Sequence, residues 1–356
     1  MRVSILGAGA IAFGAAAYTA RAQHDPMLWS PSGERTRALK VGEMLIASGA
    51  IEGVFRPRIA GSCAEAVSDS DAVMIALPGY GHKAVMDLAA PHIREAQPVI
   101  ISSHSSFGAL YLSKLLAARG VQAPIIVWGT TVTTGRQLGP TSVNVATVRQ
   151  KVDLAALPNS ATELGIGVCV SLFGDRFVRR DGLLAIALSN LNPQNHLGIA
   201  LCNLTRMERG ETWGQGENVT PAVGRLIEAL DAERLAIAAA FGLSVRTVLE
   251  HFSLSFHVPM ASVSEMNQEM HRQGRGGAGP TTLTSRYVLE DVPFGLVPTT
   301  LLGRLVGRPA YLHEAGIAIL SAAYGRDLGA DNDLLPALDL ASLSRPELER
   351  LARNGY

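Results

Sequence analysis

Short apolar runs, separated by polar stretches that contain glycine and proline, mark the N-terminal half of the chain. The first run, residues 2–6, leads directly into a glycine turn and an alanine-rich segment. Further apolar runs occur at residues 71–78, 98–103 and 124–128, with helical spacing between them. Strands that alternate with helices in this way predict a parallel, doubly wound α/β sheet of the Rossmann type.

The spacing of apolar residues changes in the second half of the chain. After Asn192, apolar positions recur three and four residues apart, most clearly over residues 222–240, as they do along helices. Pro193 is typical of a first helical position, with Asn192 as the cap. Before this change of spacing there are two more apolar stretches, residues 143–145 and 167–170. We expect both to extend the predicted sheet. We therefore expect a dinucleotide-binding domain over residues 1–184 and a mostly α-helical substrate and catalytic domain over residues 185–356.

The glycine turn has the pattern G-x-G-x-x-A. Gly7 permits a tight turn, Gly9 lets the backbone approach a pyrophosphate, and Ala12 allows close packing of helix on strand. The phosphates are expected at the N-terminus of the new helix, beside Ala10 and Ile11. A purely structural glycine turn is the alternative.

The predicted second strand ends at Ser30, where an NAD enzyme usually has an acidic residue for the ribose hydroxyls. Ser32, Arg35 and Arg37 follow, and hydroxyl and guanidinium groups suit a 2′-phosphate. We therefore expect NADP as the cofactor, with NAD as the second choice. The alternative is that Arg35 and Arg37 only solvate the next helix.

Composition excludes several classes of protein. The 356 residues suffice for about two domains. Lys plus Arg and Asp plus Glu both number 31, which favours neither a nucleic-acid nor a membrane partner. The three scattered cysteines have no metal-ligand spacing, so no metal is expected, and they suit a reducing cytoplasm. The N-terminus has the outline of a secretory signal peptide, but three glycines interrupt it.

Ligands bind at the carboxyl ends of the strands in sheets of this kind. Leu77 and Pro78 end one predicted strand and are candidates for cofactor contacts, while Thr130 and Thr131 follow another and are candidates for substrate contacts. The loop 272–280 is rich in glycine. It is either a mobile lid or an ordinary surface connection.

Two segments of the predicted helical domain carry candidate chemistry. His196 falls in the first turn of its predicted helix, where the helix dipole favours a neutral imidazole that can exchange protons. Asp291 can orient such an imidazole, Arg286 can grip a carboxylate, and Tyr287 is a further candidate for substrate contact. The structural alternatives are a histidine without a catalytic role and an ion pair of Arg286 with Glu290.

The residues resemble the octopine/nopaline (opine) dehydrogenase family. The resemblance covers most of the chain and rests on the glycine turn and on four further stretches: residues 139–158, 192–196, 220–234 and 286–298. It implies that His196 and Asp291 are catalytic and that Arg286 binds a substrate carboxylate. The chain has Gly129 before Thr130 and Thr131, where relatives often carry an acidic residue.

The resemblance implies a reaction in which a 2-oxo acid and an amine or amino acid condense, and NAD(P)H reduces the imine to a secondary amine. Reverse oxidation is then also expected. Two alternatives stay open: a dehydrogenase of a simple 2-hydroxy or 2-oxo acid, and a non-catalytic dinucleotide sensor. The sequence is compatible with a homodimer and does not fix the oligomeric state.

Overall fold

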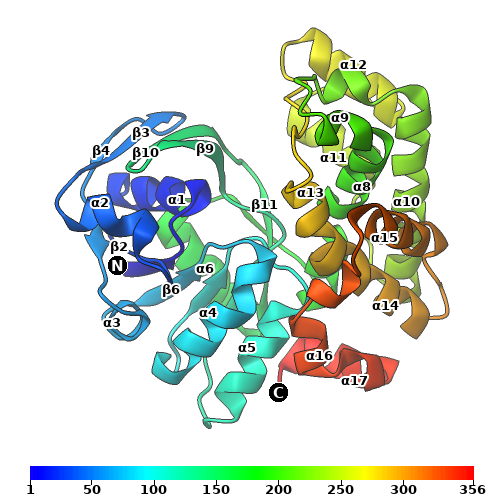
Figure 1. Ribbon diagram of the computed structural model, residues 1–356. Helices are drawn as coiled ribbons and strands as arrows, with labels where there is room; N and C mark the ends of the chain where they lie inside the picture. The colour runs from blue at the N-terminus through cyan, green and yellow to red at the C-terminus, as the bar shows by residue number, and fades with distance from the viewer. The chain divides into compact units, whose positions relative to one another are not determined.

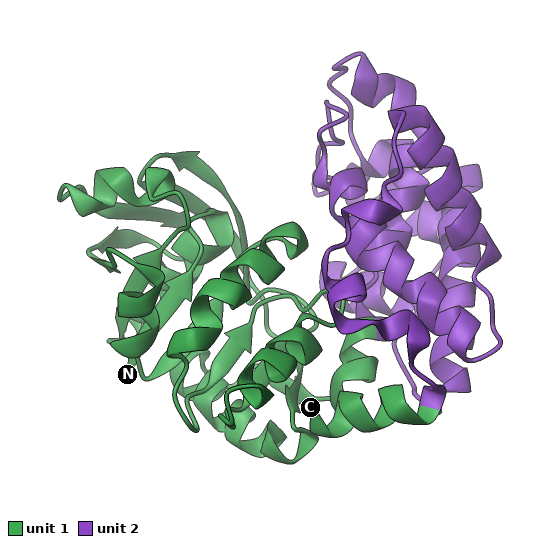
Figure 2. Cartoon of the chain, turned by 60° about the horizontal axis from the view of Figure 1, so that its bottom comes forward, with its two compact units in different colours: residues 1–187, 346–356 green, residues 188–345 purple.

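The computed structural model describes all residues from Met1 to Tyr356 and divides into two compact units (Figure 2). The first comprises Met1–Ala187 and Pro346–Tyr356, and the second comprises Leu188–Arg345. The expected division placed the whole C-terminal end in the helical domain. The observed division differs because the last helix, α17 (Arg345–Asn354), buries one apolar side and belongs with the first unit. There, the backbone N–H of Tyr356 donates to Ser113 Oγ at 3.0 Å.

The first unit contains an eight-stranded sheet in the order β12-β11-β8-β7-β6-β1-β2-β5 (Figure 1). Its strands are β1 (Arg2–Leu6), β2 (Asp25–Trp29), β5 (Arg58–Ile59), β6 (Ala72–Ile75), β7 (Val99–Ile101), β8 (Ile125–Trp128), β11 (Val152–Leu157) and β12 (Phe177–Arg179). Neighbouring strands are parallel except for β8 and β11. The predicted doubly wound α/β sheet is therefore confirmed, with one antiparallel step near an edge.

Helices cover both faces of this sheet (Figure 1). They are α1 (Ala10–Arg21) and α6 (Thr162–Phe173) on one face, and α3 (Cys63–Ser68), α4 (His82–Ala89) and α5 (Gly108–Ala117) on the other. A short helix, α2 (Arg37–Lys40), follows the second strand. The inner strands β1, β2, β6, β7, β8 and β11 are almost completely buried, which explains their continuous apolar runs.

The prediction that residues 143–145 and 167–170 extend the main sheet was wrong. Residues 167–170 lie inside α6, whose buried positions 165, 169, 172 and 173 follow the helical period. Residues 143–145 belong to a second sheet in the order β4-β3-β10-β9. Its strands are β3 (Leu45–Gly49), β4 (Gly53–Phe55), β9 (Thr133–Gly139) and β10 (Ser142–Val148).

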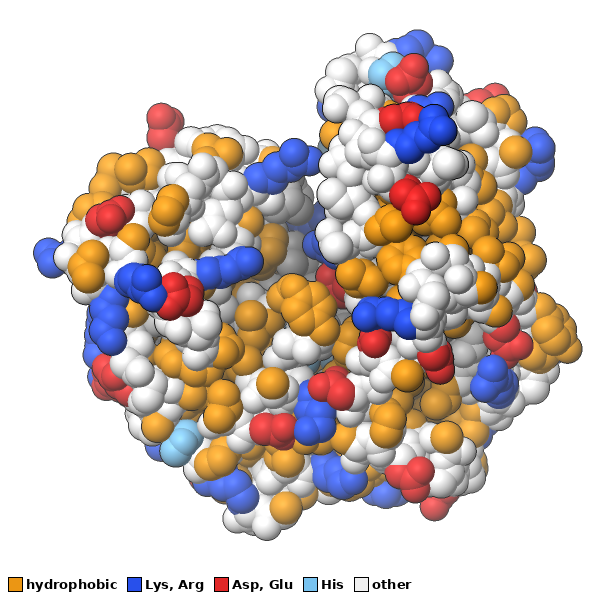
Figure 3. Space-filling view, in the orientation of Figure 1, with side chains coloured by type: hydrophobic (Ala, Val, Ile, Leu, Met, Phe, Trp, Pro, Cys, Tyr) orange, Lys and Arg blue, Asp and Glu red, His pale blue; other side chains and the backbone are white.

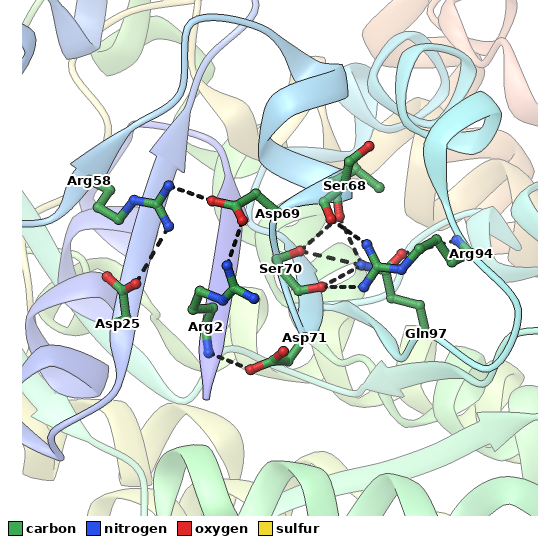
Figure 4. Close-up of polar contacts among 10 residues, drawn as sticks. Arg2, Asp25, Arg58, Ser68, Asp69, Ser70, Asp71, Arg94 and Gln97 are labelled. Atoms are coloured by element: carbon green, nitrogen blue, oxygen red, sulfur yellow. Dashed lines mark hydrogen bonds and ion pairs between the residues drawn. The ribbon is translucent and has the colours of Figure 1, made fainter.

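A polar network fastens the amino ends of the main strands (Figure 4). Asp69 accepts hydrogen bonds from Arg58 and from Arg2 Nη1 (2.5 Å), and the backbone N–H of Arg2 donates to Asp71 at 2.8 Å. Arg58 also lies 3.5 Å from Asp25. The hydrogen bond from Arg58 holds the pKa of the exposed Asp69 carboxyl below its usual range. The opposite, carboxyl ends of the strands stay available for a ligand.

The second unit is helical, as predicted. After α7 (Gly182–Ser189), which joins the units, its helices are α8 (Asn192–Cys202), α9 (Leu204–Glu208), α10 (Pro221–Ala240), α11 (Val248–Phe256), α12 (Val263–Arg272), α13 (Arg286–Leu289), α14 (Val297–Leu305), α15 (Tyr311–Tyr324) and α16 (Leu334–Leu338). The helix expected over residues 222–240 is α10. Asn192 is the first helical residue of α8 and Leu191 is its cap, so the predicted start was late by one residue.

A buried ion pair organises the second unit. Arg234, 1% exposed, donates to Asp231 Oδ1 at 2.6 and 2.9 Å and to the carbonyl oxygens of Leu188 and Arg246. Asp231 Oδ2 accepts from the backbone N–H of Val248 at 2.8 Å. Because both charges are paired and hydrogen-bonded, they tie the end of α7 and the start of α11 to α10. None of the helices in the chain has the length and apolarity that crossing a membrane requires.

Candidate active site

The glycine turn lies between β1 and α1 and takes a conformation that requires glycine. Gly7 has φ +147°, donates to Trp29 O at 2.7 Å, and leaves no room for a side chain because a Cβ would lie 2.3 Å from Ala76 O. No side chain caps the first N–H groups of α1, which begins at Ala10. Ala12 is fully buried beneath the turn. The exposed N–H groups and the absence of a Cβ at Gly9 fit a dinucleotide pyrophosphate.

Ser30 and Arg35 lie where the sequence predicts the ribose end of the cofactor. Ser30 directly follows β2, and its buried Oγ has no hydrogen-bond partner. Arg35 Nη1 lies 3.8 Å from the position that a Cβ of Gly9 would take, so its guanidinium flanks the glycine turn. Arg37, in contrast, forms an ion pair with Glu34. The orphaned hydroxyl and the flanking cation fit a polar, anionic group at this point.

The other predicted loops also follow strands. Ser32 Oγ accepts from the backbone N–H of Glu34 at 3.4 Å and so shapes the loop after β2. Leu77 and Pro78 follow β6, and Leu77 O accepts a hydrogen bond from His82 Nε2 at 3.0 Å. Burial lowers the pKa of His82 to about 4, so this imidazole is neutral at neutral pH.

Thr130 and Thr131 follow β8 in the first unit. Thr131 Oγ1 donates to Thr133 O at 2.7 Å, so its hydroxyl already has one structural partner. Both threonines are partly exposed.

His196 and Asp291, 95 residues apart, meet in the helical unit. His196 Nδ1 lies 2.6 Å from Asp291 Oδ2, and the residues are 9% and 6% exposed. Because the carboxylate of Asp291 accepts this hydrogen bond, Nδ1 carries the proton. Nε2 makes no hydrogen bond within the chain and is free to exchange a proton. His196 is the fifth residue of α8 and lies just beyond its first turn. The predicted effect of the helix N-terminus is therefore weaker than expected, and Asp291 is the dominant partner.

A π-helical turn positions Asp291. It spans Val292–Leu296 directly after Asp291 and packs on the start of α8, where a Cβ on Gly295 would lie 2.3 Å from Pro193 Cγ. Such turns occur frequently at functional sites. The close approach at Gly295 explains how two distant segments bring the carboxylate to the imidazole.

Tyr287 covers one face of the His196 ring. The ring centroids are 3.6 Å apart and the planes differ by 9°. The Tyr287 hydroxyl donates to Gln215 Oε1 at 2.5 Å, and the backbone N–H of Gln215 donates to Gly277 O at 3.0 Å. Sequence reasoning missed Gln215. The only sequence signal for Gln215 is the pair of glycines that flank it, Gly214 and Gly216. Gly216 approaches Asn267 O so closely that a Cβ would lie 2.8 Å from this oxygen.

The glycine-rich loop 272–280 is fastened at two points in the structure. Trp213 Nε1 donates to Pro280 O at 3.0 Å, and Gly279 lies directly on the indole ring. Gly214 and Ala278 form an isolated β-bridge. These contacts favour a fixed connection over the mobile lid and link the loop to Gln215.

Arg286 begins α13 beside Tyr287. Its side chain is 61% exposed, and Nε lies 3.5 Å from Glu290 Oε2. The ion pair between Arg286 and Glu290, which was the structural alternative, is thus present, but it engages only Nε of Arg286. The two terminal nitrogens make no hydrogen bond within the chain, so the fork can still bind a carboxylate.

A second histidine–carboxylate pair lies in the same unit and was not predicted. His313 Nδ1 lies 2.7 Å from Glu233 Oε2, and His313 Nε2 lies 3.1 Å from Gln194 Nε2. His313 is fully buried. Glu233 stands in one of the stretches that carried the family resemblance, but no spacing in the sequence connects it to His313.

The structure thus brings His196, Asp291 and Tyr287 into one cluster, with Arg286 adjacent in sequence. The predicted cofactor residues and the two threonines belong to the first unit. No group of three or more His, Cys, Asp or Glu side chains could hold a metal ion. Cys63 and Cys169 are buried and Cys202 is exposed, and all three are free thiols.

Comparisons with known proteins agree with this division. Residues 179–324 match the family model "NAD/NADP octopine/nopaline dehydrogenase, alpha-helical domain", and residues 3–159 match "Ketopantoate reductase PanE/ApbA". An opine dehydrogenase from Arthrobacter sp. (strain 1C) is 32% identical over 95% of this chain and 94% of its own. A vitopine synthase from Allorhizobium ampelinum is 24% identical over 93% of this chain and 95% of its own.

Solved structures show the same fold. Octopine dehydrogenase with NADH and L-arginine matches with a TM-score of 0.81, covering 99% of this chain and 98% of that chain at 14% identity. Yersinopine dehydrogenase with NADP+ matches with a TM-score of 0.73, covering 96% and 97% at 16% identity.

The glycine turn and the helical unit with its histidine–carboxylate pair define a nicotinamide-dependent dehydrogenase with a separate helical domain. The chain belongs to the opine dehydrogenase family. It is an NAD(P)-dependent oxidoreductase that acts on CH–NH bonds. The family reaction is the reductive condensation of a 2-oxo acid with an amine or amino acid, together with its reverse.

Proposed function

We propose that His196 and Asp291 carry out the proton transfers of this reaction in the present chain. The observation that carries the proposal is the 2.6 Å contact between His196 Nδ1 and Asp291 Oδ2, which leaves Nε2 as the proton-exchanging atom. Nε2 donates a proton to the substrate in the reductive direction and accepts one in the oxidative direction. The bound nicotinamide supplies or accepts the hydride.

Asp291 keeps the imidazole in one tautomer and stabilises its protonated form. Tyr287 holds the ring plane by stacking and contributes a face to substrate binding. Arg286 binds a substrate carboxylate through its two terminal nitrogens, which have no other partner. Thr130 and Thr131 provide hydroxyls for the substrate.

In the proposed cofactor site, the pyrophosphate binds at the N-terminus of α1. Arg35 and the hydroxyls of Ser30 and Ser32 bind the 2′-phosphate, so NADP is preferred to NAD. The remaining proposed contacts come from the glycine turn and from the end of β6: Gly7, Gly9, Ala10, Ile11, Ala12, Leu77 and Pro78.

The proposed substrates are a 2-oxo acid and an amine that itself bears a carboxylate. Structures of octopine dehydrogenase hold pyruvate or L-arginine, which both bear a carboxylate, and another holds agmatine, which has none. The carboxylate of the amine matches the free guanidinium of Arg286. We further propose that the enzyme works in the cytoplasm and forms a homodimer.

The decisive experiment follows NADPH absorbance with pyruvate, with and without a panel of amino acids, and identifies the product by mass. We expect NADPH oxidation only when both substrates are present, with a secondary amine as the product. Oxidation with the oxo acid alone would instead identify a simple 2-oxo acid reductase. No turnover with any pair, despite NADPH binding, would identify a dinucleotide sensor.

A further inference from the structure

Arg149 is a largely buried arginine whose guanidinium has no partner. Its Nε is completely buried and makes no hydrogen bond, and its two Nη nitrogens make none within the chain either. Burial lowers the pKa of this guanidinium from its usual value, and no carboxylate offsets the effect. Asp153, the carboxylate nearest in sequence, pairs with Arg180 Nη2 at 2.9 Å instead. Arg149 is thus a cation that lacks both full hydration and an anion.

Other arginines of the chain show what Arg149 lacks. Arg234, which is also buried, is held by the carboxylate of Asp231 and by two backbone carbonyl oxygens. On the surface, basic and acidic side chains lie interspersed (Figure 3), and water reaches the exposed ones. An unpaired charge that is removed from water destabilises the folded chain. Such a local conflict is typical of a site that offers the charge to a ligand.

The backbone fixes Arg149 at one edge of the main sheet. The residue directly follows β10, its N–H donates to Val132 O at 2.8 Å, and its carbonyl oxygen accepts from Arg176 Nη1 at 2.6 Å. The next strand, β11, pairs with β8 so that Leu154 lies beside Trp128, the last residue of β8. The segment of Arg149 therefore enters the sheet at the carboxyl end of β8, where ligands bind in sheets of this kind.

The position favours a substrate over the cofactor as the ligand. Val132, which accepts the hydrogen bond from Arg149, directly follows Thr130 and Thr131, the two threonines of the proposed substrate site. The pyrophosphate is expected at the glycine turn after β1. In the sheet, β7 and β6 lie between β8 and β1, a separation of about 14 Å. The anion for Arg149 is therefore expected on the substrate side.

We propose that Arg149 binds the carboxylate of the 2-oxo acid. This inference rests on the proposed function, in which both substrates bring a carboxylate and Arg286 binds that of the amine. A product with two carboxylates calls for two cations, and Arg149 is the second. Its two Nη nitrogens match the two oxygens of a carboxylate. The bound oxo acid then provides the anion that the chain itself does not.

The test is the binding of pyruvate to the NADPH complex of the full-length protein, measured by calorimetry for the parent and for Arg149→Met. Methionine fills much of the same volume without the charge. The Kd for pyruvate should rise about tenfold or more. The Kd for NADPH and the KM for the amine should stay within about twofold of the parent. Pyruvamide, which lacks the carboxylate, should bind parent and variant alike.

Thermal unfolding separates this role from a structural one. Because Arg149 has no partner in the chain, Arg149→Met should unfold at the temperature of the parent or above it. Arg136→Met is the matched control, because Arg136 is an exposed arginine on the neighbouring strand β9. The control should leave the affinity for pyruvate unchanged.

An unchanged Kd for pyruvate in Arg149→Met overturns the inference, and so does a parent that binds no pyruvate. Lower affinity for NADPH would assign Arg149 to a phosphate of the cofactor. A higher KM for the amine alone would assign it to the other carboxylate, and both results contradict the inference. Because pyruvate binding is measured without turnover, failure of the proposed reaction is seen separately, as the absence of a secondary amine in the assay of NADPH oxidation.

Discussion

Two histidine–carboxylate pairs in the helical unit have nearly the same geometry and very different surroundings. The Nδ1–O distance is 2.6 Å for His196 and Asp291 and 2.7 Å for His313 and Glu233. The difference lies at the other ring nitrogen. Nε2 of His196 has no partner within the chain, whereas Nε2 of His313 lies 3.1 Å from the amide of Gln194. A pair with a free nitrogen can move a proton, and a pair with both nitrogens engaged can only hold structure.

Glu233 has a structural task of its own. It accepts hydrogen bonds from the backbone N–H groups of Leu312 (2.8 Å) and His313 (3.3 Å) at the start of α15. It thereby fastens α15 to α10, while Gln194 connects the same histidine to α8. Contact between an imidazole and a carboxylate therefore does not identify a catalytic pair, whereas a second ring nitrogen without a partner does.

The largest expected effect is on turnover, from His196→Ala. Loss of the proton-exchanging group should lower kcat by roughly 100-fold or more, the usual contribution of general acid–base catalysis. NADPH affinity, measured by fluorescence titration, should stay near that of the parent, because the proposed cofactor contacts lie in the other unit. Near-normal turnover of this variant would remove His196 from the mechanism.

The next effect is on stability, from Glu233→Gln. The change leaves buried donors without their charged acceptor and should lower the free energy of unfolding by about 1–3 kcal/mol. Turnover per folded molecule should remain close to that of the parent. Chemical denaturation and steady-state kinetics on the same preparation separate the two readouts. A large loss of kcat with unchanged stability would mean that the roles of the pairs are reversed.

The stabilisation by Glu233 should also depend on pH. Burial raises the pKa of Glu233, but the hydrogen bonds from His313 and from two backbone N–H groups outweigh burial and hold the pKa below its usual value. A carboxyl with a lowered folded-state pKa contributes stability above its unfolded pKa, about 4.3, and loses it as the pH falls through the folded pKa. The stability gap between parent and Glu233→Gln should therefore close below about pH 4.3.

Arg286→Lys tests the substrate side of the catalytic pair. Lysine keeps the charge but loses the fork, so KM for a carboxylate-bearing amine should rise about tenfold. The control is the same amine with its carboxyl amidated, for which parent and variant should differ little. If the parent does not distinguish the two amines, Arg286 serves only its ion pair with Glu290.

The smallest expected effect comes from Tyr287→Phe, which keeps the ring on His196 and removes the hydroxyl bound to Gln215. Loss of one hydrogen bond of about 1 kcal/mol should lower kcat about fivefold. Tyr287→Leu, which also removes the stacked ring, should lose more. Equal rates for both variants would show that stacking on His196 is without consequence.

The sequence predicted those features whose signals are local. The glycine turn, Ser30 at the end of the second strand and the helix over residues 222–240 each depend on a few neighbouring residues. Residues 167–170 were misassigned because a short apolar run is compatible with strand and helix alike, and only the spacing of positions 165, 169, 172 and 173 separates the two.

Contacts between distant segments could not be predicted from spacing. Asp291 was a candidate partner of His196 on chemical grounds only, and the family resemblance supplied their shared catalytic role, since 95 residues separate them. Gln215 is 72 residues from Tyr287, and Glu233 is 80 residues from His313, with no motif to connect either pair. Such partners are defined by packing of helices, which leaves no periodic trace in one sequence.

The most direct test of the account compares Asp291→Asn with Glu233→Gln, which remove the same charge from the two pairs. In one assay of NADPH oxidation at saturating substrates, Asp291→Asn should lower kcat by roughly 100-fold or more, and Glu233→Gln should leave kcat within about threefold of the parent. If the two variants lose turnover equally, or if Asp291→Asn retains it, the free nitrogen of His196 is not what makes its pair catalytic.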